Sequence, residues 1–362
     1  MIDGSGSSTF WMGKQVLVTG HTGFKGSWLS LWLNELGAKV HGYALPPDTT
    51  PSLHDMLNDG LYLSSTMADI RDVEQLRKAV REIQPEIVFH MAAQPLVRMG
   101  YVAPVDTFST NVMGVVHLLE SLRDVQCLRA VVNVTTDKVY ENREWLWGYR
   151  EVDRLGGSDP YSASKACAEL VTAAYRKSFF ADSDCPGIAT ARAGNVIGGG
   201  DWAANRLVPD CLRALMTEQN IVLRNPKSIR PWQHVLEPLH GYLILAERLY
   251  ANPTGYGGAW NFGPLQARTV QEVAVILCEQ WGQSASQILT ESSQFFAEAY
   301  ERVLDSTKAR RLLGWAPRWT LDMTLEKIIE WTKAYRDHRD MRSICLSQIH
   351  DYCGTGGMGC FN

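Results

Sequence analysis

The sequence predicts an α/β fold, in which a doubly wound parallel sheet is combined with a smaller C-terminal lobe. Two observations carry this prediction. Short apolar runs alternate with amphipathic helical segments through the first half of the chain, and a glycine-rich turn joins the first strand to the first helix. Such alternation is typical of a parallel sheet covered by helices on both faces, which is the Rossmann-type arrangement.

The elements follow in a regular order from residue 15. Strands are predicted at residues 15–19, 39–45, 86–91 and 130–135, with helices around 29–36, 73–83 and 112–122. We expect residues 11–194 to form the sheet domain, with a returning segment near 230–265 that adds a strand at 259–263. We expect residues 195–229 and 266–345 to form the smaller lobe, and residues 1–10 and 346–362 to be tails.

Composition excludes several classes of protein. The 362 residues are 45% apolar and 20% charged, with a net charge of −4. That charge gives no basic surplus for nucleic acid, and no run of about 18 apolar residues predicts a membrane span. The eight cysteines are scattered and fit no compact zinc pattern, so we expect reduced thiols, a cytoplasmic protein and no metal site.

The turn after the first strand predicts a phosphate-binding site. Glycines at positions 20, 23 and 26 allow a tight turn and a close approach of the backbone to a pyrophosphate. The helix that follows aims its unpaired N–H groups at the anion. The residues expected to bind a dinucleotide here are Gly20, Thr22, Gly23, Phe24, Lys25 and Gly26.

The Gly-x-x-Gly-x-x-Gly spacing resembles the extended short-chain dehydrogenase/reductase superfamily. Further matches are Asp69-Ile70 as an adenine-binding pair, Ala92-Ala93 as a small-residue loop, and Asn111 as a support of the active-site helix. The resemblance implies an NAD cofactor. No acidic residue directly follows the second strand, and no arginine there could receive a 2′-phosphate, so NADP stays open.

Tyr161 and Lys165 match the superfamily's Tyr-x-x-x-Lys motif. Their spacing places both side chains on one face of a helix. A nearby ammonium favours a phenolate, so we expect Lys165 to lower the pKa of Tyr161. Tyr161 then serves as the base that takes a hydroxyl proton, and Lys165 also holds the nicotinamide ribose.

Thr136, Asp137 and Lys138 lie at the end of a buried strand, where a doubly wound sheet has its ligand crevice. Thr136 matches the superfamily's Ser/Thr that binds the substrate hydroxyl. The Asp-Lys pair resembles the CDP-glucose 4,6-dehydratases, whereas dTDP-glucose and GDP-mannose enzymes typically carry a glutamate at the second place. The resemblance extends to about Trp331.

The resemblance implies conversion of CDP-glucose to CDP-4-keto-6-deoxyglucose and water, for deoxysugar and lipopolysaccharide O-antigen biosynthesis. Oxidation at C4 precedes loss of the C5 proton and the C6 hydroxyl, and hydride then returns to C6. By the resemblance, Asp137 is the acid at C6 and Lys138 the base at C5. Burial favours the neutral form of each, while direct pairing would oppose it. We therefore expect their side chains to diverge, or a proton to move between them.

Arginine suits the two phosphate charges of a CDP-sugar. The candidate substrate-binding residues are Gln94, Arg98, Asn195, Arg206, Arg230 and Arg302. Relatives commonly pair two helices between subunits, so the apolar faces at residues 112–122 and 170–175 predict a homodimer or homotetramer.

Three alternatives stay open. Another nucleotide-sugar 4,6-dehydratase would share these motifs, and an epimerase of the superfamily would need no acid-base pair beside Thr136. A non-catalytic NAD(P)-sensing protein would usually have lost Tyr161 or Lys165, and both are present.

Overall fold

Seven parallel strands form the central sheet of the computed structural model, which describes residues 9–355 apart from 58, 183, 265, 285–287 and 291–302. The strand order is β11-β6-β5-β4-β1-β2-β3, and every neighbouring pair is parallel. The strands are β1 (Gln15–Thr19), β2 (Lys39–Ala44), β3 (Ser64–Met67), β4 (Ile87–His90), β5 (Ala130–Val134), β6 (Gly187–Arg192) and β11 (Gly258–Asn261). The predicted α/β fold is confirmed.

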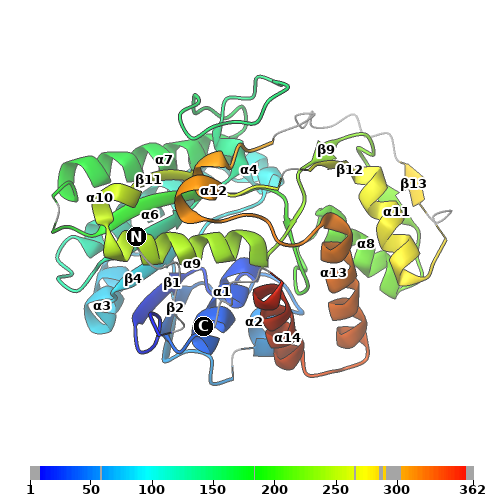
Figure 1. Cartoon of the computed structure of the whole chain (residues 1–362), viewed down its shortest axis with the longest axis horizontal. Helices are drawn as coiled ribbons and strands as arrows, with labels where there is room; N and C mark the ends of the chain where they lie inside the picture. Colours follow the sequence, from blue (N-terminus) through cyan, green and yellow to red (C-terminus); the bar gives the residue numbers. More distant parts are fainter. Residues whose placement is uncertain are drawn as a thin grey trace.

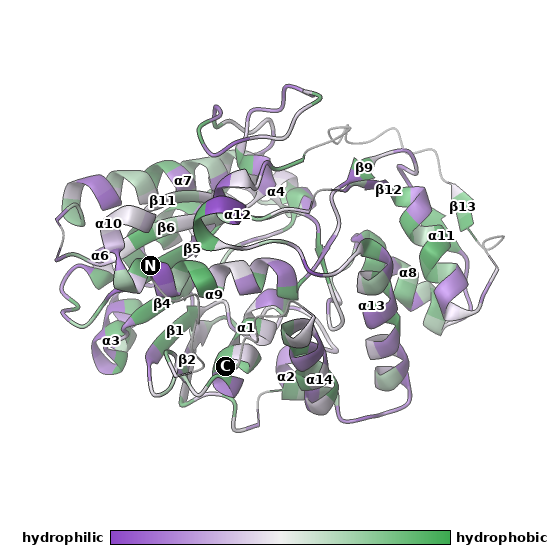
Figure 2. Cartoon of the chain, in the orientation of Figure 1, coloured by the Kyte–Doolittle hydropathy of each residue, from purple (hydrophilic) through white to green (hydrophobic). Residues whose placement is uncertain are grey.

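Helices cover both faces of this sheet (Figure 1). One layer contains α3 (Val73–Ile83), α6 (Gly114–Leu122) and α7 (Pro160–Phe179). The other contains α1 (Phe24–Glu35), α9 (Leu236–Ala251), α12 (Thr307–Leu313) and α14 (Met341–Gly354). The central strands β1, β4 and β5 are largely apolar (Figure 2), because both of their faces are buried, whereas the edge strand β3 is polar and mostly exposed.

Short elements complete the sheet domain. They are α2 (Leu53–Leu57), α4 (Val97–Val102), α5 (Pro104–Phe108), the π-helical turn η1 (Ser109–Met113), the 3₁₀ turn η2 (Asp137–Val139) and α10 (Pro253–Tyr256). In the described residues, no helix is both long and apolar enough to cross a bilayer.

The smaller lobe has its own apolar core, which is built around three helices. These are α8 (Leu207–Met216), α11 (Val270–Trp281) and α13 (Leu321–Arg336). Three two-stranded pairs accompany them: β7 (Val196–Ile197) with β10 (Gln233–His234), β8 (Ile221–Leu223) with β13 (Ile288–Thr290), and β9 (Ile229–Arg230) with β12 (Arg268–Thr269). The chain enters this lobe after β6 and returns to the sheet at β11, which overlaps the strand expected at 259–263.

The prediction that residues 346–362 form a tail is wrong as far as Thr355. Helix α14 packs against α1, and its residues Cys345, Ile349 and Tyr352 are fully buried in the core of the sheet domain. The carboxylate of Asp340 caps the helix by accepting hydrogen bonds from the amides of Arg342 and Ser343. This cap and the apolar spacing outweigh the glycine-rich composition beyond it.

The apolar residues of 112–122 divide between the core and the surface, so the expected pairing between subunits stays a prediction. Val115, Leu118, Leu119 and Leu122 are buried in the core that α6 shares with α3 and the sheet of the same chain. Met113 is 44% exposed, and Val112 and Val116 are half-buried, so this segment keeps some apolar surface outside the core.

Candidate active site

The carboxyl ends of β1, β4, β5 and β6 meet at one edge of the sheet, where open parallel sheets bind their ligands. The segments that follow these strands are residues 20–23, 91–96, 135–139 and 193–195. Helix α7, which carries Tyr161 and Lys165, packs against η2 beside them. The topology therefore brings the glycine turn and the Asp137-Lys138 pair to one place.

The glycine turn is tightly packed against the loop after β4. Gly20 adopts φ +75°, and a Cβ at this position would lie 2.6 Å from the amide nitrogen of Ala92. A Cβ on Gly26 would overlap the carbonyl oxygen of Gly20. Helix α1 has no side-chain cap at Gly23 and no acidic residue in its first turn. Its N–H groups are thus available to an anion, and the turn fits a dinucleotide pyrophosphate.

We expect Gly26→Ala to weaken NAD binding about 10- to 100-fold, because overpacking costs about 1–3 kcal/mol. A fluorescence titration with NAD measures the change. Gly354→Ala is the control, since a Cβ there meets nothing within 4 Å. Equal NAD affinity in the two variants would contradict the role given to the turn.

Three cations gather beside this turn. Burial, followed by the nearby Arg206 and Lys165 cations, lowers the pKa of the half-buried Lys25 to about 8. Arg206 also forms an ion pair with Asp201, at 3.1 Å between Nη1 and Oδ2. Positive charges that repel one another in a partly buried site favour an anionic ligand, so the electrostatics suit a diphosphate.

Tyr161 and Lys165 lie on one face of α7, and both are buried. Burial raises the pKa of Tyr161 to about 12, although a hydrogen bond with Thr136 opposes the rise. Burial likewise lowers the pKa of Lys165 to about 8. The pKa of Tyr161 is therefore raised rather than lowered, because burial dominates and Lys165 is not among the causes of the shift. The Lys165 ammonium instead donates a hydrogen bond to the carbonyl oxygen of Val134, at 3.3 Å.

Thr136, Asp137 and Lys138 follow β5 directly. The Thr136 hydroxyl donates a hydrogen bond to Oδ1 of Asp137, at 2.9 Å. Asp137 is 4% exposed, whereas Lys138 is half-buried. Both belong to the 3₁₀ turn η2, in which successive side chains project about 120° apart. Among the ion pairs of the described part of the chain, none joins Asp137 to Lys138.

Asn111 connects the loop after β4 to the active-site helix. Its Oδ1 accepts a hydrogen bond from the Gln94 amide at 2.9 Å, and its Nδ2 donates to the hydroxyl of Ser164 at 2.9 Å. That hydroxyl donates in turn to the carbonyl oxygen of Tyr161. Asn111 lies in the π-helical turn η1, and such turns often mark functional sites.

Two of the expected cofactor-binding positions lie further along the sheet edge. The Asp69 carboxylate accepts three hydrogen bonds from the guanidinium of Arg71, with a shortest N–O distance of 2.6 Å. These hydrogen bonds lower the pKa of Asp69. Ile70 is buried, and it packs where a Cβ on Gly114 would lie. Thr22 donates a hydrogen bond to the Leu45 carbonyl oxygen, which ties the glycine turn to the segment after β2.

The expected substrate-binding residues do not all lie in the same surroundings. Arg206 lies within electrostatic range of Lys25 and Tyr161. The Gln94 side chain is committed to the Thr107 hydroxyl, at 2.8 Å, and to the Leu96 amide. The remaining positions are as follows: Arg98 donates to Oδ1 of Asn205, Asn195 has φ 48°, Arg230 is buried on β9, and Arg302 lies outside the described residues.

A buried ion pair beneath the site, formed by Glu169 and Arg192, was not predicted from the sequence. Glu169 follows Lys165 by four residues, so it shares the face of α7 that carries Tyr161 and Lys165. That spacing was a usable signal for Glu169. Arg192 lies on β6, and its pairing with Glu169 depends on the tertiary fold.

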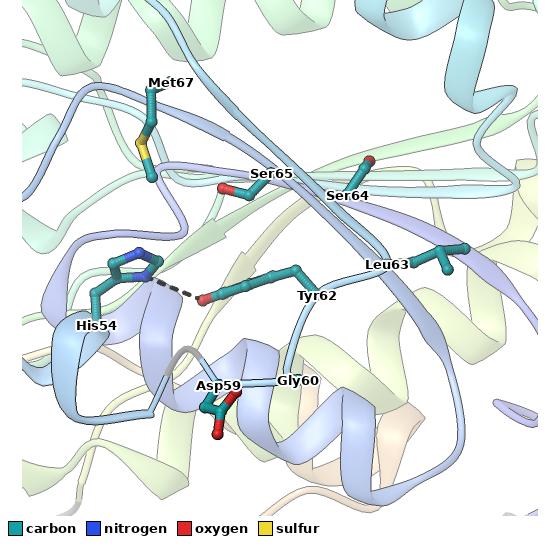
Figure 3. Close-up of a pocket in the computed structure, with 8 residues that line it drawn as sticks. All are labelled: His54, Asp59, Gly60, Tyr62, Leu63, Ser64, Ser65 and Met67. Carbon is teal, nitrogen blue, oxygen red and sulfur yellow. Dashed lines mark hydrogen bonds between the residues drawn. The ribbon is translucent and has the colours of Figure 1, made fainter.

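A surface pocket of about 450 Å³ lies away from this cluster, between α2 and β3. Figure 3 shows its lining, including the hydrogen bond between His54 and Tyr62. His21 of the glycine turn contacts the same region, with Nε2 2.8 Å from the Ser65 hydroxyl. None of the residues expected to be catalytic lines this pocket. In the described part of the chain, no three His, Cys, Asp or Glu side chains gather as metal ligands.

Comparisons with known proteins agree with this geometry. The family model described as GDP-mannose 4,6 dehydratase matches residues 17–328. CDP-glucose 4,6-dehydratase of Salmonella typhimurium is 53% identical over 349 residues, which cover 95% of this chain and 97% of that protein. UDP-glucose 4-epimerase of Mycoplasma pneumoniae is 26% identical over 90% of this chain and 97% of that protein.

The fold has close counterparts among solved structures. A dTDP-glucose 4,6-dehydratase of Streptomyces venezuelae, crystallised with NAD, superposes with a TM-score of 0.77. It is 23% identical and covers 90% of this chain and 99% of its own. The family model and the 53% identity together show that this chain belongs to the nucleotide-sugar 4,6-dehydratases of the extended short-chain dehydrogenase/reductase superfamily.

Proposed function

We propose that this chain is a hydro-lyase that converts CDP-glucose to CDP-4-keto-6-deoxyglucose and water, with NAD as its cofactor. The observation that carries the proposal is the placement of Thr136, Asp137 and Lys138 beside Tyr161 and Lys165. The 53% identity to a CDP-glucose 4,6-dehydratase supports the choice of substrate. The product would enter deoxysugar biosynthesis, including that of O-antigens.

The residues of the glycine turn and Lys25 would hold the cofactor diphosphate, Asp69 and Ile70 would face its adenine, and Ala92 and Ala93 would line its path. When bound, NAD supplies a positively charged nicotinamide ring that takes the C4 hydride and later returns it to C6. NADP stays the alternative, since no acidic residue directly follows β2.

Oxidation at C4 requires a base for the hydroxyl proton. Tyr161 takes this proton, and Thr136 holds the same hydroxyl in line with it. Because burial raises the pKa of Tyr161 to about 12, the phenolate forms only with positive charge close by. Lys165 contributes part of that charge and positions the nicotinamide ribose. Asn111 fixes the helix on which both side chains lie.

Loss of water then needs a base and an acid on neighbouring carbons. The C4 ketone acidifies the C5 hydrogen, so Lys138 can remove the C5 proton and give it back to C5 once hydride has been added at C6. Asp137 donates a proton to the departing C6 hydroxyl, which leaves as water. The divergent directions of the two side chains in η2 let each reach its own carbon.

Arginines would hold the CDP diphosphate. Arg230 and Arg206 are favoured, because Arg230 is buried on β9 and Arg206 lies near Lys25. Asn195, Arg98, Gln94 and Arg302 complete the proposed set. The side chain of Gln94 would have to leave the Thr107 hydroxyl to reach a substrate.

We further propose that the chain forms a homodimer or homotetramer and resides in the cytoplasm. Exposed apolar side chains occur on α4, α5 and η1, which pack against α7: Met99, Tyr101, Val102, Val105, Phe108 and Met113. Leu170 of α7 is also 60% exposed. Sedimentation equilibrium tests the oligomeric state. The seven cysteines of the described residues are free thiols, which suits a reducing compartment.

A panel of CDP-, dTDP-, GDP- and UDP-glucose tests the proposed function, with the alkaline absorbance of the 4-keto sugar as the readout. We expect product from CDP-glucose alone. Conversion of another nucleotide in preference would assign a different 4,6-dehydratase. A new epimer without a 4-keto product would assign an epimerase, and no turnover with retained NAD binding would indicate a sensor.

A further inference from the structure

A buried ion pair lies directly beneath the proposed catalytic groups. Glu169 and Arg192 have side chains that are each 3% exposed. Nη2 of Arg192 lies 2.8 Å from Oε2 of Glu169, and Nε lies 2.9 Å from Oε1, so the pair is bidentate. A buried ion pair is often no more stabilising than apolar packing of the same volume. Its presence therefore calls for a reason beyond stability.

Glu169 is hydrogen-bonded to the start of the segment that carries the proposed catalytic residues 136–138. Its carboxylate accepts a hydrogen bond from the Thr135 hydroxyl at 2.6 Å and another from the Thr190 hydroxyl at 2.7 Å. Thr135 immediately precedes Thr136 and Asp137. With the two bonds from Arg192, the carboxylate accepts four hydrogen bonds from β6 and the end of β5.

Arg192 is hydrogen-bonded to Tyr140, at the other end of the same segment. Its Nη1 donates to the hydroxyl of Tyr140 at 2.7 Å, and its guanidinium lies 4.9 Å from the centroid of the Tyr140 ring. The Tyr140 hydroxyl then donates to Oδ1 of Asn261 on β11, at 2.7 Å. Tyr140 directly follows η2, so residues 136–139 are bracketed by the two halves of one ion pair.

The pair is also joined to the other half of the site. Glu169 lies one turn after Lys165 on α7, and its charge partly offsets the effect of burial on that lysine. The same two side chains thus connect the helix that carries Tyr161 and Lys165 to the turn that carries Asp137 and Lys138. These two groups of residues serve different steps, oxidation at C4 and elimination across C5 and C6.

We propose that Glu169 and Arg192 are positioning residues that hold Asp137 and Lys138 against the sugar already aligned on Tyr161, so that loosening the bracket slows elimination more than oxidation. This inference rests on the proposed function. A purely structural pair would lower both steps together, through the fraction of folded enzyme.

Tyr140→Phe is the sharpest test, because it removes one hydroxyl from the bracket and leaves the ion pair and the proposed catalytic groups in place. Tyr242→Phe is the matched control: Tyr242 is also fully buried, and its hydroxyl makes no hydrogen bond within the described residues. Thr135→Val acts at the other end of residues 136–139, because it removes the hydroxyl that donates a hydrogen bond to Glu169. The three variants are compared with the unaltered holoenzyme.

Two rates are measured with CDP-glucose: the rise of reduced-cofactor absorbance in a single turnover, and the formation of the 4-keto-6-deoxy product. For Tyr140→Phe and Thr135→Val we expect elimination to slow about tenfold, with oxidation within about twofold of the unaltered enzyme. Tyr242→Phe should change neither rate. A parallel loss of both rates, or no loss in either bracket variant, would overturn the inference.

A second readout separates this inference from the proposed function. If the unaltered enzyme converts none of the four nucleotide hexoses, the proposed function fails, and hydrogen exchange of the backbone amides of residues 136–140 decides the positioning role. We expect faster exchange in Tyr140→Phe than in Tyr242→Phe, both with NAD bound. Equal exchange rates of residues 136–140 in the two variants would overturn the positioning role of Glu169 and Arg192.

Discussion

Lys138→Met is expected to leave oxidation at C4 intact and to reduce product formation about 10²- to 10⁴-fold, the range that a general base contributes. Lys138 is half-buried in η2 and forms no ion pair among the described residues, so its amine is available to the substrate. Methionine has a similar length and cannot accept a proton. The enzyme should therefore stop at the 4-keto hexose with its C5 proton still in place.

Two measurements check this result. Reduced cofactor should accumulate in a single turnover, and deuterium from the solvent should not enter C5. Lys177→Met is the matched control, because Lys177 is exposed at the end of α7 and should leave turnover unchanged. Full turnover by Lys138→Met would remove Lys138 from the role of base.

Lys165→Met is expected to lower turnover at least about 100-fold and, at the same time, to stabilise the protein without cofactor at neutral pH. Burial lowers the pKa of Lys165 to about 8 from a usual 10.5. At pH 7 the charged ammonium therefore costs the folded state about 3 kcal/mol. The lost hydrogen bond to the Val134 carbonyl offsets part of the gain, about 1–2 kcal/mol.

The sign of the pH dependence follows from the lowered pKa. The folded protein releases the Lys165 proton near pH 8, whereas the unfolded chain keeps it to about pH 10.5. The penalty is fully present below pH 8 and disappears as the pH rises through this window. Urea denaturation at pH 7 and pH 10 should show the stability advantage of Lys165→Met shrinking. An advantage that is absent at pH 7 would contradict the argument.

Local sequence patterns predicted most of the sheet domain. β1, β4 and β5 are short, largely apolar runs whose burial can be inferred without knowing their neighbours. Helix α14 was not predicted, because a glycine-rich composition near the C-terminus is typical of a frayed tail. The spacing of Met341, Cys345, Ile349 and Tyr352 was present in the sequence, as was the Asp340 cap.

The candidate site likewise combines contacts that the sequence predicts with contacts that only the tertiary fold creates. Tyr161 with Lys165, and Thr136 with Asp137, are close in sequence, so helical or strand-end geometry brings them together. The gathering of Lys25 with Arg206, and of Glu169 with Arg192, joins residues of different elements. No periodicity encodes such contacts. The raised pKa of Tyr161 could not be predicted either, because it depends on burial rather than on the lysine four residues away.

The return of the chain at β11 has a consequence for the order of synthesis. β6 lies between β5 and β11, and the lobe's first elements, β7 to β10, are encoded between β6 and β11. A nascent chain on the ribosome therefore presents the unpaired edge of β6 until Gly258–Asn261 has emerged. Open edges of this kind attract other strands, so translation arrest inside the lobe should yield an aggregation-prone fragment rather than a free-standing nucleotide-binding half.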